Sequence, residues 1–149
     1  MRRTMVKNSS FAFVPALAIA WGLVLATFGV RAEDIVVIVN KDNPNVVDKQ
    51  YIARLYTGAI KGWPDGSPAF PVDQLEESAA RTVFYASVVG KSQATMRAIW
   101  QQNIFSGNGL PPKIVSPDAA MKHLVANNRN AIGYILASQV DASVKVIAK

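Results

Sequence analysis

The sequence predicts an α/β domain with a mixed or parallel sheet that is covered by helices on both faces. Apolar, β-branched runs occur at residues 35–39, 131–135 and 144–147, near the beginning and the end of the region that follows residue 32. Several stretches with helical spacing of apolar residues and recognisable caps lie between these runs. Strands that alternate with helices favour a sheet with both faces buried.

The first 32 residues have the pattern of an export signal. Three basic residues within the first seven precede an uncharged, apolar stretch from Phe11 to Val30. The ending Val30-Arg31-Ala32 suits signal peptidase, so we expect a signal peptide at residues 1–32 and one domain at residues 33–149. Arg2-Arg3 lacks the rest of a twin-arginine pattern, which favours the general secretory (Sec) route to the periplasm. The alternative is a retained membrane anchor, because about 20 apolar residues span a bilayer.

Composition limits what this domain can be. Residues 33–149 are enough for one hydrophobic core and too few for two ordinary domains. They keep 12 of the 16 basic residues and all 10 acidic ones, a net charge of about +2 that is dispersed along the chain. Nucleic-acid binding needs clustered Lys and Arg, so we exclude that partner class. The absence of cysteine excludes disulfides and thiolate metal sites.

The first half of the domain contains a strand, a helix and a loop. Ile35–Val39 is apolar throughout and predicts a buried central strand. Asp48 can cap a helix that Gly58 ends. Five Gly and Pro residues between positions 62 and 71 exclude regular helix, and they predict an ordered loop held by Trp63 with a short edge strand at 70–72.

The second half contains three helices and three strands. Ser78 precedes a pattern in which Ala80, Phe84 and Val88 recur with Val83 beside them, up to Gly90. Ser92 caps the next helix, which ends abruptly after Phe105. Its expected buried stripe consists of Met96, Ile99, Trp100 and Ile104. The sequence further predicts a strand at 113–115, a helix that Ser116 caps and that runs to about residue 126, and strands at 131–135 and 144–147.

Catalytic and metal sites are not expected. His123 is the only histidine, lies in a predicted helix, and is accompanied by no nucleophile motif or metal-ligand spacing. The carboxylates of the domain are scattered except for the pair Glu76-Glu77, whereas a zinc site needs several converging ligands. We therefore expect no enzyme activity, no metal and no cofactor.

The best candidate for a binding site is the start of the helix at Ser78. The Ser78 hydroxyl, the backbone amides of Ala79 and Ala80, and Arg81 one turn into the helix together suit a tetrahedral anion. A simpler interpretation stays open at this point. Ser78 would then only cap its own helix, Arg81 would be solvated, and Glu76-Glu77 would supply the negative charge that the helix dipole favours.

Four segments in order resemble the substrate-binding proteins of bacterial phosphate ABC transporters. They are Val36–Pro44, Ile52–Trp63 with its Tyr-x-Gly-x-Ile-x-x-Trp element, Ser78–Phe84, and Ala131–Tyr134 with the sequence Ala-Ile-Gly-Tyr. They span nearly the whole of residues 33–149. The resemblance implies one lobe of a type II periplasmic binding protein, in which a strand-end loop and the following helix hold phosphate against a second lobe.

The chain departs from the family pattern at the implied phosphate site. The family has Ser-Gly-Thr where this chain has Ser78-Ala79-Ala80, and Gln74 stands where an upstream arginine is expected. The resemblance implies phosphate or a related oxyanion as ligand and an ABC permease as partner. Because the changes remove a hydroxyl and a guanidinium, two alternatives stay open: an interaction module that binds a sensor protein or membrane partner, and a self-dimer that rebuilds the two-lobed cleft.

Overall fold

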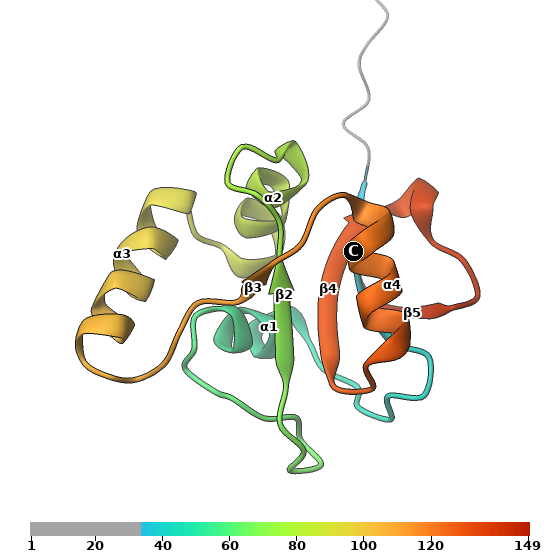
Figure 1. The fold of residues 1–149 in the computed structure, drawn as a ribbon, viewed down its shortest axis with the longest axis horizontal. Coiled ribbons are helices and arrows are strands. Elements are labelled where there is room, and N and C mark those ends of the chain that lie inside the picture. The colour runs from blue at the N-terminus through green and yellow to red at the C-terminus, as the bar shows by residue number, and fades with distance from the viewer. Residues whose placement is uncertain (1–33) are drawn as a thin grey trace, which may run out of the picture. The chain divides into compact units, whose positions relative to one another are not determined.

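The computed structural model describes residues 34–149 of the chain, and the predicted export signal at residues 1–32 lies outside them. The described residues form five strands and four α-helices, shown in Figure 1. In chain order the elements are β1 (Ile35–Asn40), α1 (Lys49–Tyr56), β2 (Phe70–Asp73), α2 (Ala79–Phe84) with a π-helical continuation η1 (Tyr85–Val89), α3 (Gln93–Phe105), β3 (Lys113–Ile114), α4 (Asp118–Asn127), β4 (Ala131–Leu136), the 3-10 turn η2 (Ala137–Gln139) and β5 (Val144–Ala148). Within residues 34–149, every helix is too short or too polar to cross a membrane.

The five strands form one mixed sheet in the order β3-β2-β4-β1-β5. The strands β3, β2 and β4 are parallel to one another, and β1 is antiparallel to both β4 and β5. All six residues of β1 are buried, because neighbouring strands flank it on both sides and helices cover both faces. The mixed α/β sheet expected from the sequence is therefore confirmed.

Alternate residues of β1 point into two separate cores. Val37 and Val39 pack with residues of α1, α2 and η1 on one face, whereas Val36 and Ile38 pack with α4 on the other. Figure 1 shows this layering, with α4 on one side of the sheet and α1 and α2 on the opposite side. Side chains of successive strand residues point to opposite faces, so a fully apolar strand needs helices on both.

Most of the helix boundaries lie where the capping residues and glycines of the sequence predict them. The carboxylate of Asp48 accepts a hydrogen bond from the Tyr51 amide and begins α1, and Gly58 follows the helix with a φ of 75°. Ser92 accepts from the Thr95 amide and begins α3. Trp63 is buried and its indole N–H donates to the Asn130 carbonyl at 3.0 Å, which orders the Gly- and Pro-rich loop.

Two expectations about strands and caps were wrong. The strand β2 is not at the edge of the sheet, because β3 pairs with its second half through Val72 and Asp73 while β4 pairs with its first half. Ser116 does not cap α4; the helix starts after Pro117, which makes no capping side-chain bond. The carboxylate of Asp118 instead accepts from the Leu136 amide at 3.0 Å and ties the helix start to the end of β4.

The expected buried faces of two helices also need correction. After Phe84 the helix continues as a π-helix, which closes its hydrogen bonds one residue further along the chain and so rotates the following side chains. Tyr85, the first residue of this turn, is buried, while Val83, expected in the core, is 37% exposed. In α3 the stripe is buried only at its start: Met96 is 1% exposed but Ile104 is 51% exposed, since no layer covers the end of this helix.

Candidate functional site

The carboxyl ends of the three parallel strands meet at one edge of the sheet. Asp73 ends β2, Leu136 ends β4, and the starts of α2 and α4 lie next to them in sequence and space. Gln74 links the two helix starts, since its side-chain amide donates to Asp118 at 2.8 Å and its carbonyl oxygen accepts from Ser78 at 2.6 Å. In open α/β sheets, ligands bind outside the carboxyl ends of the strands. The predicted residues therefore lie at the edge where a site is expected.

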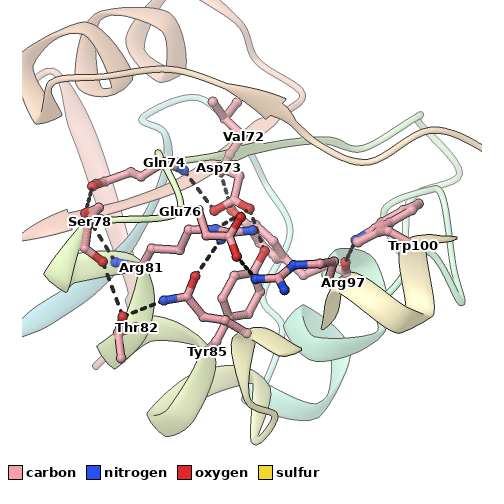
Figure 2. Close-up of polar contacts among 12 residues, drawn as sticks. Val72, Asp73, Gln74, Glu76, Ser78, Arg81, Thr82, Tyr85, Arg97 and Trp100 are labelled. Carbon is pink, nitrogen blue, oxygen red and sulfur yellow. Dashed lines mark hydrogen bonds and ion pairs between the residues drawn. The ribbon is translucent and has the colours of Figure 1, made fainter. Parts of the chain in front are cut away.

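Asp73 is the centre of the polar network at this edge, which Figure 2 shows in close-up. Its side chain is only 4% exposed. One carboxylate oxygen accepts from the Tyr134 hydroxyl at 2.5 Å and from the Gln74 amide at 2.8 Å. The other accepts from the Tyr85 hydroxyl at 2.6 Å and from Nε of Arg81 at 3.0 Å. Four donors thus compensate a carboxylate that is almost fully removed from water.

The network also changes the acidity of its members. Burial raises the pKa of the Tyr85 and Tyr134 hydroxyls well above the ordinary value, and the nearby Asp73 charge raises it further. Both tyrosines are therefore neutral donors at any physiological pH. Burial lowers the pKa of Arg81, but the Asp73 carboxylate together with Tyr85 and Tyr134 outweighs burial, and the pKa is raised. Arg81 is thus a permanent cation beside an anion.

The structure holds the guanidinium of Arg81 on three sides. Asp73 accepts from Nε, Gln93 of α3 accepts from Nη1 at 2.6 Å, and the Tyr85 ring lies 4.9 Å from the guanidinium carbon in a cation–π contact. The side chain is 15% exposed, so Arg81 is not the solvated surface residue of the simpler interpretation. Hydrogen bonds to Asp73 and Gln93 use two of its five N–H donors, and the Tyr85 hydroxyl interacts with the guanidinium as well.

Ser78, Ala79 and Ala80 form the first turn of α2 beside this arginine. The Ser78 hydroxyl oxygen accepts from the Arg81 amide at 3.4 Å, so it caps the helix as expected. Its proton is donated to Gln74. Ala79 is exposed and Ala80 is half-buried, and amides in a first helical turn have no carbonyl of their own helix to bind.

The acidic pair before α2 is arranged differently from the expectation. Glu76 forms an exposed ion pair with Arg97 of α3 rather than compensating the helix dipole. Glu77 is exposed, and α2 has no acidic residue in its first turn. Exposed ion pairs contribute little to stability, about 0–1 kcal/mol, so the Glu76–Arg97 pair adds little to the stability of the domain.

Sequence reasoning missed the residues that hold Arg81. Asp73 is a charged residue at the end of a short, otherwise apolar strand. This unusual position was the only feature of the sequence that could have pointed to Asp73. Gln93 and Tyr134 carry no such signal, because they reach Arg81 and Asp73 only through the fold, from positions 12 and 61 residues away. Tyr85 lies one turn after Arg81 on the same helix, a spacing at which two side chains can meet.

His123 is exposed on α4. Its backbone carbonyl accepts a hydrogen bond from the Asn127 side chain. Within the described residues, no three His, Asp or Glu side chains come close enough to hold a metal ion. The polar chemistry at the strand ends therefore consists of hydrogen-bond donors, one buried carboxylate and one fixed arginine.

The sheet, its covering helices and the polar strand ends have the fold expected from the resemblance, which is like one lobe of a type II periplasmic binding protein. The resemblance to phosphate ABC transporter substrate-binding proteins is confirmed by solved structures with the same fold over 77% of the chain. No protein-family model matches the chain, and no curated protein matches its sequence.

Three solved structures illustrate the similarity. A phosphate ABC transporter substrate-binding protein from Clostridium perfringens, solved with bound phosphate, is 28% identical, with a TM-score of 0.63 and 77% of this chain covered. An ABC-type phosphate transport receptor from Vibrio cholerae is 24% identical, with a TM-score of 0.60 and the same coverage. PstS from Borrelia burgdorferi is 10% identical, with a TM-score of 0.59 and 78% coverage. The match spans 44%, 45% and 47% of these three chains, so this chain corresponds to less than half of each.

Proposed function

We propose that this protein is an exported solute-binding lobe that binds phosphate or a related tetrahedral oxyanion in the periplasm. The proposed site consists of the Ser78 hydroxyl, the amides of Ala79 and Ala80, and the guanidinium of Arg81. An ABC permease for phosphate is the proposed partner, and residues 1–32 are the proposed export signal. The name of the Clostridium perfringens structure, which includes bound phosphate, supports the choice of ligand.

The fixed position of Arg81 is the observation that carries this proposal. An arginine that is held by Asp73, Gln93 and the Tyr85 ring loses little conformational entropy when it binds an anion. Asp73 and Gln93 accept from only two of its five N–H donors, and a guanidinium can bind two oxygens of phosphate through a pair of parallel donors. The free amides at the start of α2 add donors of the kind that bind anions at helix starts.

A second function is favoured by a different observation. The Asp73 carboxylate already balances the charge of Arg81, and the Ser78 proton is already donated to Gln74. A domain that no longer binds an anion and serves as an interaction or sensory module would still keep these two contacts, because they are made within the fold. In that case Arg81 and Ser78 stabilise the domain, and a sensor protein or membrane partner binds elsewhere on the surface.

We include a second copy of the chain among the proposed partners. The match spans 44% of the Clostridium perfringens protein, so more than half of that chain has no counterpart among the matched residues. A bound anion that faces solvent makes weaker contacts than one enclosed between two surfaces. Sedimentation of the purified protein with and without phosphate tests this arrangement, which a strict monomer at high concentration would contradict.

Thermal unfolding with added anions separates the two functions. The protein is purified from cells that express the full chain, freed of phosphate, and heated with millimolar phosphate, sulfate or molybdate. An anion present at about 100 times its dissociation constant stabilises the folded state by roughly 2.7 kcal/mol. In a domain of this size that raises the midpoint on the order of 10 °C. We expect this rise for phosphate.

Three variants show whether the proposed site is responsible. Ser78→Ala and Arg81→Ala should each reduce the phosphate-induced rise, whereas Arg54→Ala, which removes an exposed arginine of α1, should leave it unchanged. Absence of a rise with every anion, or an equal rise in the Arg81 variant, would contradict the proposed site and favour the interaction module.

A further inference from the structure

A groove on the far side of the domain is not explained by anion binding. It runs between the end of α1, the side of α3 and the segment that leads into β3, and its two adjoining parts have volumes of about 610 and 300 Å³. Both parts are lined by Gly58, Lys61 and Asn108. Phe70 at the start of β2 lines the groove, whereas Asp73 at the end of the same strand belongs to the anion site. The two features therefore lie at opposite ends of β2.

The groove and its surroundings expose an unusual amount of apolar surface. Leu110 in its wall is 78% exposed and Phe70 is 39% exposed, while Leu55, Ile60 and Trp100 contribute further apolar lining. Next to it, the end of α3 and the strand β3 present three more large apolar side chains. These are Ile104, Phe105 and Ile114, with exposed fractions of 51%, 91% and 53%. An exposed apolar patch of this kind, rimmed by polar residues, marks an interaction surface.

The charge of the groove has one sign. Lys61 and Lys91 line the larger part, and Lys61 and Lys113 line the smaller part. Neither part is lined by an acidic residue, and none of these three lysines forms an ion pair within residues 34–149. A partner with carboxylates beside an apolar side chain would complement both the charge and the apolar lining.

The walls of the groove are preformed. The Trp100 indole donates to the Tyr56 carbonyl at 3.1 Å, and the Asn103 side chain donates to the Thr57 carbonyl at 3.0 Å, so α3 is fixed against the end of α1. The Asn108 amide donates back to the Asn103 carbonyl at 2.8 Å, which orders the segment after α3. A surface that is already ordered loses little entropy on binding.

From these observations we propose that this groove binds an acidic, apolar peptide segment of a partner protein. The segment places an apolar side chain between Trp100 and Leu110 and carboxylates near Lys61 and Lys113. A second copy of this chain fits less well, because a two-fold contact through the same face brings its lysines against one another. A membrane surface is an alternative occupant, which the test below distinguishes from a peptide. The inference is independent of anion binding, since the two regions share no residue.

The test uses a displayed library of random short peptides and protein purified from cells that express the full chain. We expect selected peptides to carry Asp or Glu beside Leu, Phe or Trp. Their affinity, measured by fluorescence anisotropy, should fall by about tenfold or more in Phe105→Ser/Leu110→Ser and in Lys61→Glu/Lys113→Glu. The substituted side chains are exposed, so both variants should keep the thermal midpoint of the parent protein.

Matched controls distinguish this groove from general stickiness. Val46→Ser removes a side chain that is 90% exposed outside the groove, and Lys49→Glu reverses an exposed charge outside it. Both should bind the selected peptides as the parent does. The proposal is overturned if no peptide is selected, if the selected peptides are basic or uncharged, or if the groove and control variants bind equally. Binding only to vesicles that contain phosphatidylglycerol would also overturn it, in favour of a membrane surface.

Discussion

Replacing Asp73 with alanine tests how the polar network supports the fold. The change leaves Arg81 almost buried without its counter-charge, and it removes the acceptor of the Tyr85 and Tyr134 hydroxyls and of the Gln74 amide. Loss of one partner of a buried ion pair costs about 3–5 kcal/mol, and a buried donor left unsatisfied costs about 1–3 kcal/mol. Water can reach part of the resulting space, so we expect a loss of about 4 kcal/mol.

Urea unfolding followed by tryptophan fluorescence measures this loss. At about 4 °C per kcal/mol for a domain of this size, the thermal midpoint should fall on the order of 15 °C. Asp48→Ala is the comparison: it removes the exposed cap of α1 and should cost about 1 kcal/mol.

A double-mutant cycle identifies the source of the effect. When Arg81→Ala is combined with Asp73→Ala, no uncompensated charge remains, so the combined loss should be smaller than the sum by more than about 1 kcal/mol. A loss below about 1 kcal/mol for Asp73→Ala, or strict additivity in the cycle, would refute the reasoning.

Two further predictions concern backbone geometry and pH. Gly58→Ala should cost about 2–4 kcal/mol in urea unfolding, because φ is 75° and the new Cβ would lie 2.8 Å from the Trp100 ring. Gly90→Ala, with a φ of 71° and open space around it, should cost only about 1 kcal/mol, and equal losses would contradict the role of the clash. Because burial raises the pKa of Tyr85 and Tyr134, the unfolded chain releases these protons near pH 10 while the folded protein keeps them. Burial raises the pKa of Tyr56 in the same way. Stability should therefore be complete below pH 10 and fall above it by about 1.4 kcal/mol per pH unit and tyrosine, which urea unfolding at rising pH measures. Phe at positions 85 and 134 should make the fall less steep and leave the part that Tyr56 contributes.

The parts of the fold that local chemistry determines were predicted well. An apolar run such as Ile35–Val39 has no stable place except a buried strand, and Asp48, Ser78 and Ser92 bind amides only three residues away. Such interactions need no knowledge of the rest of the chain, so the sequence shows them directly.

The errors arose where tertiary contacts override a local pattern. Ser116 looked like the cap of α4, but the helix starts after Pro117, and the fold brings Gln74 and Leu136 to the carboxylate of Asp118, from positions 44 and 18 residues away. The π-helical turn Tyr85–Val89 was also not expected, because a pattern with a period of 3.6 residues cannot reveal it.

The candidate site was found only in part for the same reason. Ser78 and Arg81 were found because they lie at a recognisable helix start. Asp73 and Gln93, which decide how Arg81 is held, lie 8 and 12 residues from it in sequence and meet it through the packing of α2 on the sheet and on α3. Their role became visible only with the coordinates of the domain.

Titration calorimetry of phosphate into the phosphate-free protein and into Arg81→Ala is the most direct test of the anion site. We predict a saturable heat for the parent protein and none for the variant, because the guanidinium of Arg81 carries the proposed binding. No saturable heat in the parent protein, or the same heat in both proteins, would contradict the proposed site at the start of α2.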